Sequence, residues 1–425
     1  MCKERLFAEA AKRRLDLSIH ASRAALAARG ELVEPYDRLL HVVRSRCGIL
    51  SRRNSSRASP DLNRALEAMA LHHADWLREP SSWRPPAGSA WPVLASLAEH
   101  LFARFALPRF LASVWLDGNG RVERLPQHDW YKRLGRGESV RRIGLPISLT
   151  RAMAHRFAQA PDHFTVIRAL RWAQVLTLGG SDELVSALVA TRLGEVLENE
   201  DYWAGVIRFF VAHPELPAEQ LGPIVDFVQH QRFQARDGVR VDGSYGPIPP
   251  PRPDFTLKGR TPSSLLRLVA AWHDELGKSA GPDVSWPPAP LEPFQRIERI
   301  PRAQPTRESD RRPAVDEPSE EVRIWSISEL CSSRALFLDG RELHHCVATY
   351  VQACQQRRSS IWSLQLETRR GRYRQLTIEV HLATRKIVQA RRKYNGAPLA
   401  IESALLAEWA AREGLIVGEV MRRHL

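Results

Sequence analysis

The sequence predicts a mixed α+β protein: a mostly helical N-terminal region, then a small C-terminal domain with an antiparallel three-stranded meander and flanking helices. Three observations predict this class. Stretches rich in Ala, Leu and Arg recur at helical spacing through the first half of the chain. A segment rich in proline and charge then interrupts the periodicity. Beyond it, apolar and polar residues alternate with the period of two that is typical of strands.

Residues 1–236 are expected to form consecutive helices with short connections, as in a bundle or an irregular solenoid. Gly179-Gly180 and Pro214 end two of these helices, because glycine favours helix C-termini and proline cannot continue a helix. The clearest expected helices span residues 8–29, 32–43, 62–77, 91–105, 162–178, 181–193, 201–213 and 221–233. No clean fixed-period repeat is visible in this region.

The segment 237–320 is expected to be a Pro-rich, partly disordered linker that contains one helix. The run Pro249-Pro250-Pro251 cannot continue a helix. Residues 277–320 combine proline and charge with few aliphatic side chains, a composition that cannot bury a core of its own. The single helix is expected at residues 263–276.

Residues 321–425 are expected to form the compact α+β domain. Asp339-Gly340 is expected to form a turn that precedes the first helix of the meander. In the middle strand, Thr377 and Glu379 alternate with aliphatic residues, so one face of the sheet should pack against helices and the other should carry polar side chains. The expected elements are a helix at 343–356, strands at 360–366, 373–382 and 386–394, and a helix at 398–412.

The charge balance points to a polyanionic partner. The chain carries a formal net charge of +14. Its C-terminal part, residues 321–425, has the highest net charge per residue, with 17 Lys and Arg against 10 Asp and Glu. A basic balance favours DNA, RNA or another polyanion as the partner. The alternative is that arginine spread along the chain only keeps the protein in solution.

Several classes of protein and site are not expected. No apolar run approaches the ~20 residues that a membrane span needs, and no signal peptide is visible, so we expect a cytoplasmic protein without a membrane span. The five cysteines include no Cys-x-x-Cys pair, which predicts reduced thiols and neither a disulfide framework nor a zinc ribbon. No phosphate-binding or dinucleotide-binding glycine motif is present, so we expect no cofactor.

The most specific pattern lies in the last hundred residues. The sequence His345-Cys346-Val347-Ala348-Thr349-Tyr350 resembles the His-Cys-Val-Gly-x-Tyr signature of PcfJ-like proteins, a bacterial family found with conjugative plasmids and other mobile elements. Thr377-Ile378-Glu379 resembles the Thr-Ile-Glu strand of that family. The stretch from Gln389 to Asn395 resembles its Gln-x-Arg-Gly-x-x-Asn element, and Ser363-Leu364 stands where the family often has a similar pair.

The chain departs from the family pattern at two positions. Ala348 and Arg392 stand where the family has glycine. The second departure puts in doubt a close approach of a ligand to that backbone. The resemblance implies a mobile-element context, with other proteins of the element as candidate partners. It implies no particular activity.

The candidate catalytic residues are His345, Cys346 and Glu379. Cys346 is expected near the start of a helix, where backbone N–H groups and the helix dipole favour a thiolate. The alternative is a thiol packed in the core. Adjacent His and Cys residues on a helix cannot easily converge on one ion, so no metal site is expected. Glu379 is expected on the polar face of the sheet, where a cross-strand ion pair with Arg391 is the structural alternative.

The candidate binding residues form two groups. Ser363, Gln389, Arg391 and Asn395 are expected to line a polar pocket suited to a nucleotide or a phosphodiester, with the arginine for phosphate and the amides for base or sugar. Arg370, Arg372 and Tyr373 are expected at a basic hairpin tip, where tyrosine can stack on a base.

Three functions therefore remain open from the sequence. The first is an accessory protein of a mobile or conjugative element that binds nucleic acid or another polyanion through its basic C-terminal domain. The second is an enzyme that acts on a nucleotide or a phosphodiester. The third is a protein-interaction scaffold. Whether the chain is an enzyme is not decided by the sequence, nor is its oligomeric state.

Overall fold

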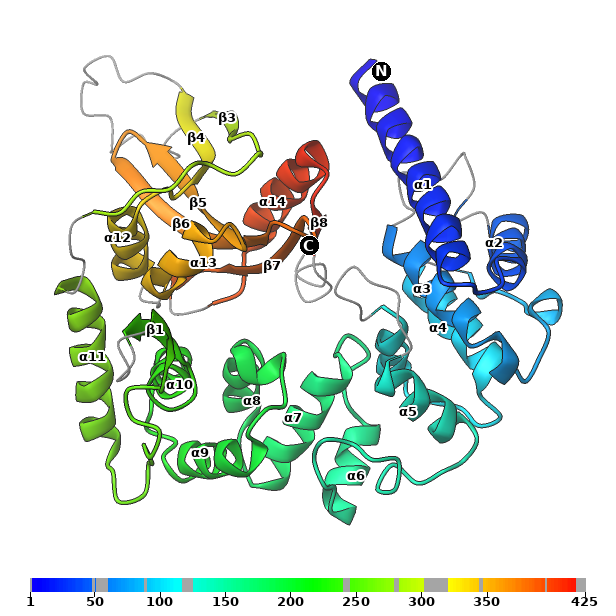
Figure 1. Cartoon of the computed structure of the whole chain (residues 1–425), viewed down its shortest axis with the longest axis horizontal. Helices are drawn as coiled ribbons and strands as arrows, with labels where there is room; N and C mark the ends of the chain where they lie inside the picture. The colour runs from blue at the N-terminus through cyan, green and yellow to red at the C-terminus, as the bar shows by residue number, and fades with distance from the viewer. Residues whose placement is uncertain are drawn as a thin grey trace, which may run out of the picture. The chain divides into compact units, whose positions relative to one another are not determined.

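The computed structural model of the 425-residue chain describes the backbone in ten stretches. Two compact units are present (Figure 1): the first comprises Met1–Ser181 with Gly194–Glu200, and the second comprises Asp182–Leu193 with Asp201–Leu425. The stretches are residues 2–47, 50, 60–87, 90–116, 125–239, 245–278, 283–301, 320–343, 347–393 and 396–417.

The first unit is helical over the residues that the structure describes, as the sequence predicts. Short 3-10 turns join several of the helices. The α-helices are α1 (Cys2–Ala28), α2 (Glu34–Arg46), α3 (Pro60–Leu71), α4 (Ala90–Phe102), α5 (Pro126–Gly135), α6 (Arg151–Ala158) and α7 (Val166–Thr177). The 3-10 helices are η1 (His73–Asp75), η2 (Pro80–Ser82) and η3 (Arg109–Trp115). Thr165 caps α7, because its side chain accepts a hydrogen bond from the backbone N–H of Arg168.

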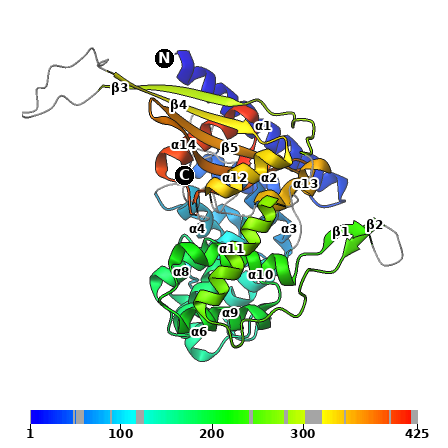
Figure 2. The same ribbon diagram turned by 90° about the vertical axis from the view of Figure 1, so that its left-hand side faces the viewer.

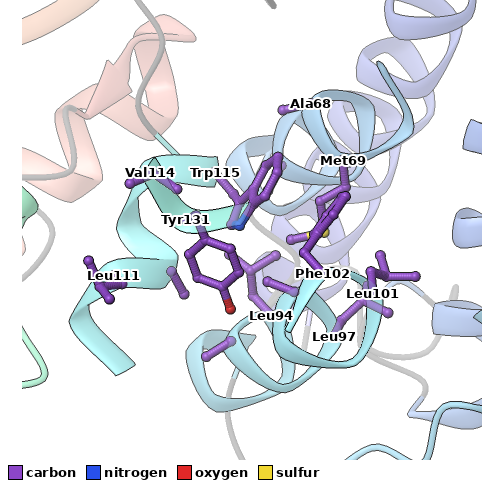
Figure 3. Packing of buried hydrophobic residues seen from close by; sticks show 14 of the residues in the cluster. Ala68, Met69, Leu94, Leu97, Leu101, Phe102, Leu111, Val114, Trp115 and Tyr131 are labelled. Carbon is purple, nitrogen blue, oxygen red and sulfur yellow. The ribbon is translucent and has the colours of Figure 1, made fainter. Parts of the chain in front are cut away.

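Aromatic and aliphatic side chains pack together in the core of this unit (Figure 3). Trp115, the last residue of η3, is 1% exposed. Its indole stacks on the ring of Phe102 with centroids 4.6 Å apart, and meets Tyr131 edge-on at 5.6 Å. Burial of several large aromatic rings contributes about 2–3 kcal/mol each to the stability of the unit. This core therefore ties α4, η3 and α5 together.

A buried hydrogen-bond chain runs beside the aromatic core. Lys132 Nζ lies 3.1 Å from His72 Nδ1 and 2.7 Å from Asp75 Oδ2. An ammonium group only donates, so His72 accepts at Nδ1 and carries its proton on Nε2. That N–H donates to His128 Nδ1 at 3.1 Å, and His128 Nε2 donates to the carbonyl oxygen of Val114 at 3.1 Å. One charged donor thus fixes the tautomer of both histidines.

The second unit begins with helices and a small hairpin. The helices α8, α9, α10 and α11 match helices that the sequence predicts, with ends that differ by up to four residues. The elements are α8 (Asp182–Val189), η4 (Arg192–Gly194), α9 (Glu200–Ala212), α10 (Ala218–Arg232), β1 (Arg236–Val239), β2 (Tyr245–Ile248) and α11 (Pro262–Lys278). Two of these elements cross the boundary between the units, because Gly194 and Glu200 belong to the first.

A six-stranded sheet forms the C-terminal part of the second unit, with strand order β3-β4-β5-β6-β7-β8. All neighbouring strands are antiparallel except β7 and β8, which are parallel and joined through α14. The strands are β3 (Phe294–Pro301), β4 (Glu320–Glu329), β5 (Ser359–Thr368), β6 (Gly371–His381), β7 (Lys386–Arg391) and β8 (Ile416–Val417). The associated helices are α12 (Ser333–Leu343), η6 (Val347–Tyr350), α13 (Val351–Gln355) and α14 (Ala400–Glu413).

Helices cover both faces of this sheet (Figure 1). Trp409 and Leu405 of α14 pack on the aliphatic face, together with Trp362 and Ile378 of the strands. Helices α12 and α13 pack on the opposite face, where Leu336 and Cys354 contact Ile361 of β5. Helices α12 and α13 therefore cover part of the face that carries Ser363, Thr377 and Glu379, and only the remainder of that face is open to solvent.

The predicted three-stranded meander is wrong in its size. The three predicted strands correspond to β5, β6 and β7, but β3, β4 and β8 extend the sheet on both sides. The strand β3 is hard to predict, because apolar and polar residues alternate only weakly along its charged sequence between Pro293 and Pro301. The strand β8 is too short for a periodic signal, since it has two residues after the left-handed cap Gly414.

The predicted turn at Asp339-Gly340 is also wrong, because both residues lie inside α12. The helix begins where the hydroxyl of Ser332 accepts the N–H of Ala335 and the carboxylate of Asp283 accepts the N–H of Arg334. The predicted continuous helix over 343–356 is replaced in the described residues by the end of α12, the 3-10 turn η6 and the short helix α13.

The stretch 237–320 contains more regular structure than its composition predicts. It holds all but the first residue of the β1–β2 hairpin, the expected helix as α11, and the strand β3 of the sheet. The domain boundaries at residues 236 and 320 stay predictions. In the part of the chain that the structure describes, we find no helix that is both long and apolar enough to cross a membrane.

The buried histidine pair predicts an acid-sensitive first unit. Burial lowers the pKa of His128 to about 3, and the neighbouring His72 and Lys132 add to this effect. An unfolded histidine titrates near 6.5, so below about pH 6.5 the unfolded chain binds a proton that the folded chain does not. The free energy of unfolding should therefore fall by up to about 1.4 kcal/mol per pH unit as the pH drops towards 5.

The variant His128→Asn tests this origin. It keeps an acceptor for the N–H of Leu125 but has no group that titrates in this range. We expect it to be less stable at neutral pH and to lose part of the acid dependence, as measured by amide hydrogen exchange of α3 and α5. Asp75 and Asp129, which lie 2.7 and 2.8 Å from Lys132 Nζ, are unchanged in the comparison. Parallel pH profiles for the two proteins would contradict the assignment to His128.

Candidate functional site: the polar face and basic end of the C-terminal sheet

A row of polar residues crosses the sheet on the face that packs against α12. Ser363 of β5 stands opposite Thr377 of β6, and Thr377 stands opposite Arg391 of β7. One step further along the strands, Glu379 stands opposite Gln389. The sequence-predicted residues of three strands are therefore brought together on one face, because side chains two residues apart share a face.

A buried carboxylate from α12 lies over this row. Asp339 is fully buried, and its Oδ1 accepts a hydrogen bond from Ser363 Oγ at 2.7 Å. Its Oδ2 accepts a hydrogen bond from the hydroxyl of Thr377. The guanidinium of Arg374 lies 3.4 Å from Oδ1 and also pairs with Glu342 at 3.3 Å. These contacts attach α12 to β5 and β6, the middle two strands of the sheet.

Burial dominates the electrostatics of Asp339. Removal from water raises the pKa of its carboxyl group above the usual range, while the hydroxyls of Thr377 and Ser363 and the charge of Arg374 oppose the rise. A buried carboxylate needs its oxygens satisfied, and here two hydroxyls and a guanidinium do so. The contacts of Asp339 are thus those of a residue that holds the domain together.

Glu379 occupies the less covered part of the same face. Its Oε1 accepts a hydrogen bond from Ser359 Oγ at 2.8 Å, and its side chain is only half-buried. The strand register places Gln389 opposite Glu379, and Thr377 opposite Arg391, rather than Glu379 opposite Arg391. Arg391 is 8% exposed, so its guanidinium lies within the domain and not at its surface.

Two cysteines close to this face are poor thiolates. Burial raises the pKa of Cys354 to about 12, and the negative charges of Glu329 and Glu379 add to the rise. Burial and the neighbouring Glu329 raise the pKa of Cys331 to about 11. Because the thiolate is the nucleophile, neither thiol is suited to covalent catalysis at neutral pH.

The β5–β6 hairpin carries the exposed basic group. Arg369 and Arg370 form its two-residue turn and are exposed, and the hydroxyl of Thr368 accepts the N–H of Arg370 at 3.1 Å. Arg372 pairs with Glu367 at 2.7 Å across the strands. Tyr373 is 44% exposed, and its hydroxyl donates to the carbonyl oxygen of Arg370 at 3.2 Å. This end of the sheet therefore presents guanidinium groups beside an aromatic ring.

The second predicted basic cluster contributes less to the surface. Arg391 is buried, and Arg392 pairs with the buried carboxylate of Glu402 at 3.1 Å. Lys393 is exposed. The structure thus separates the binding candidates into an exposed group at the hairpin tip and a covered group on the polar face.

Three candidate residues lie outside the described residues. These are His345 and Cys346, which fall between Leu343 and Val347, and Asn395, which follows Lys393. Their roles stay predictions. Within the described ranges, no group of three or more His, Cys, Asp and Glu side chains is placed to hold a metal ion.

Asp339 and Arg374 are the residues of this network that the sequence interpretation missed as a pair. Asp339-Gly340 carries a turn signal, and Arg374 belongs to an arginine-rich run that by sequence alone indicates an exposed hairpin. One signal was present: hydroxyl residues Ser363 and Thr377 stand at strand positions whose neighbours are apolar. Paired hydroxyls on a covered sheet face need an acceptor, and a carboxylate supplies one.

The fold and this polar face define an α+β domain in which a sheet is held between helices on both faces. Residues 298–404, about a quarter of the chain, match the family model described as PcfJ-like protein, so the C-terminal region contains a PcfJ-like domain. The match runs from β3 to the first turns of α14 and so includes the polar row, the hairpin and α12. No curated protein and no solved structure matched the chain.

The role of Asp339 predicts a large difference between two carboxylates that share Arg374. The substitution Asp339→Ala leaves two buried hydroxyls without their acceptor and Arg374 with Glu342 as its remaining partner, so it should lower the free energy of unfolding by about 3–5 kcal/mol. The matched control Glu342→Ala removes a half-exposed partner of the same arginine and should cost less than about 1 kcal/mol. Urea unfolding of both variants measures the difference.

The substitution Asp339→Asn adds a pH test. The pKa of Asp339 is raised in the folded state, so its contribution to stability falls as the pH rises through the folded-state pKa. The asparagine variant cannot ionise, so its stability relative to the wild type should increase from acid to neutral pH.

Equal losses for Asp339→Ala and Glu342→Ala would show that the buried network does not hold the helix.

Proposed function

We propose that the C-terminal domain binds nucleic acid through the basic end of its sheet, and that the protein serves as an accessory protein of a mobile genetic element. The observation that carries the binding proposal is the β5–β6 turn. It exposes Arg369 and Arg370, and no ion pair of either side chain is found within the described residues. The mobile-element context rests on the PcfJ-like resemblance alone.

The electrostatics of the domain favour this end of the sheet. Several other arginines near the sheet are paired with carboxylates: Arg374 with Asp339, Arg392 with Glu402, and Arg296 with Glu408. The two turn arginines retain their charge for an external anion. Release of counterions from phosphates then favours binding, with a strength that depends on salt.

Tyr373 supports contact with an unpaired base. Its ring is 44% exposed beside the turn, and the hydrogen bond to the carbonyl of Arg370 fixes its direction. An exposed ring held next to guanidinium groups is the arrangement with which proteins bind single strands, because phosphates contact the cations and bases stack on the ring. We therefore expect single strands to bind at least as tightly as duplexes.

A pair of double variants tests the site. Arg369→Gln with Arg370→Gln should weaken binding of a labelled single-stranded oligonucleotide by roughly tenfold and reduce the salt dependence, since each phosphate contact contributes about 0.7 to the slope of log K against log salt concentration. The matched control is Arg357→Gln with Arg358→Gln, which removes the same charge from the opposite end of β5. Fluorescence anisotropy in a salt series measures both.

The control should change affinity by less than about twofold, because general charge falls off within a Debye length. Equal weakening by the two double variants would assign binding to the net charge of the chain rather than to the hairpin. No binding by the wild-type protein would remove the proposal.

A second candidate function is catalysis or ligand binding on the polar face. It is favoured by the convergence of Glu379, Gln389 and Arg391 on one face of the sheet. In this hypothesis His345 and Cys346 supply the base and the nucleophile, and the substrate is a nucleotide or a phosphodiester.

Alkylation of the cysteines against pH tests the second candidate. Cys331 and Cys354, with pKa values raised to about 11 and about 12, should react slowly at neutral pH and serve as internal references. Rapid alkylation of Cys346, followed by peptide mass spectrometry, is what a catalytic thiolate predicts. A Cys346 that reacts no faster than the references would remove cysteine catalysis.

A further inference from the structure

In the part of the chain that the structure describes, the outer strand of the sheet has one unpaired edge. β3 pairs with β4 along its full length, from Phe294 opposite Ile327 to Pro301 opposite Glu320, without a shift in register. No described strand lies on its other side (Figure 2). Every second residue of β3 therefore directs its backbone N–H and C=O away from the sheet, which makes this edge a template for another strand.

The side chains along β3 leave this edge accessible. Gln295, Arg296 and Arg299 are exposed, and Ile297 is 59% exposed although it is a large aliphatic residue. Ile297 stands opposite Ile324 of β4, and Val322, two residues earlier on the same face, is 36% exposed. An apolar strip thus reaches the free edge of the sheet.

We propose that this edge is a homodimer interface, in which β3 of two copies pair antiparallel with Ile297 opposite the partner's Ile297. The sheet then continues through both copies. The two-fold axis places Arg296 opposite the partner's Glu298, and Glu298 opposite the partner's Arg296. The inference goes beyond nucleic-acid binding and does not depend on it.

The charge sequence of β3 selects both the occupant and the register. In an antiparallel homodimer the axis passes beside one residue, which then faces its own copy. An axis at Arg296, Glu298 or Arg299 would place like charges directly opposite each other, which destabilises a pair of strands. An axis at Ile297 instead gives an apolar pair flanked by two opposite-charge pairs. The strand is therefore complementary to itself.

The same charges have a second interpretation, in which they guard the edge against pairing. Charges prevent such pairing in two ways: they repel the charges of a second strand, or they would be buried without a partner in the interface. On β3 the positive Arg296 and the negative Glu298 lie symmetrically about an exposed apolar residue, so a second antiparallel copy attracts rather than repels. In the isolated chain Arg296 pairs with Glu298 at 3.3 Å and with Glu408 at 3.2 Å, which keeps the guanidinium on this face of the strand.

The dimer has a geometric consequence for the basic hairpin. The last residue of β3 lies at the same end of the sheet as the β5–β6 turn, because Pro301 pairs with Glu320 and Ile324 pairs with Glu367. An antiparallel partner runs in the opposite direction. The two basic turns therefore lie at opposite ends of the joined sheet.

A mixing experiment with two charge-reversal variants of the full chain tests the proposal. Arg296→Glu alone places two Glu–Glu pairs in the interface, and Glu298→Arg alone places two Arg–Arg pairs there. Each variant should sediment as a monomer at concentrations where the wild-type protein is a dimer. Mixed together they restore both opposite-charge pairs, so a heterodimer of one chain of each kind should form in sedimentation velocity and native mass spectrometry.

A second variant guards against an effect on folding. Ile297→Asp changes an exposed residue, so the chain should keep its fold by circular dichroism, yet it places two carboxylates at the axis and should be monomeric. A wild-type protein that stays monomeric over the accessible concentration range would overturn the proposal. Two charge variants that remain dimeric alone, or that stay monomeric when mixed, would overturn the register and with it the inference.

Discussion

The carboxylate of Asp339 is the contact on which the C-terminal domain depends. It is buried beneath α12, where hydroxyls from β5 and β6 and the guanidinium of Arg374 satisfy its oxygens. A buried charge with these partners tolerates little change in geometry, because the loss of any one of them leaves an unpaired polar group. The polar row on the sheet serves first to attach α12. The side chains that this attachment does not use remain exposed, and they determine the surface chemistry of the domain.

The attachment divides the arginines of the domain by role. Arg374 and Arg392 neutralise carboxylates inside or beside the core, whereas Arg369 and Arg370 stand in a turn that the packing does not use. Net charge alone could not make this division, since each of these residues counts equally. The proposed nucleic-acid contact therefore rests on two exposed turn arginines for which no carboxylate partner is found in the described structure, and not on the charge of +14.

Local patterns predicted the elements that local physics controls. The alternation through Leu376 and Ile378 identified β6, and a stop at Gly179-Gly180 identified the end of α7. Asp339 was misplaced because a turn preference of less than about 1 kcal/mol is overridden by three tertiary contacts, which no local pattern contains. The strand β3 was missed for the same reason: pairing with β4 stabilises it, whereas its charged sequence contains no clear strand pattern. Of the candidate site, the sequence predicted the shared face of Glu379 and Gln389, but not that α12 covers Thr377 and Ser363.

The most direct test of the central claim is amide hydrogen exchange of the full chain with and without a single-stranded oligonucleotide. If the packed polar face is structural and the hairpin is the contact, the oligonucleotide should slow exchange in the β5–β6 turn around Arg369 and Arg370. Exchange at the Ser359 end of β5 and along β7 should stay unchanged. Protection centred on Glu379 and Gln389, with none at the turn, would contradict the account and assign the ligand to the polar face.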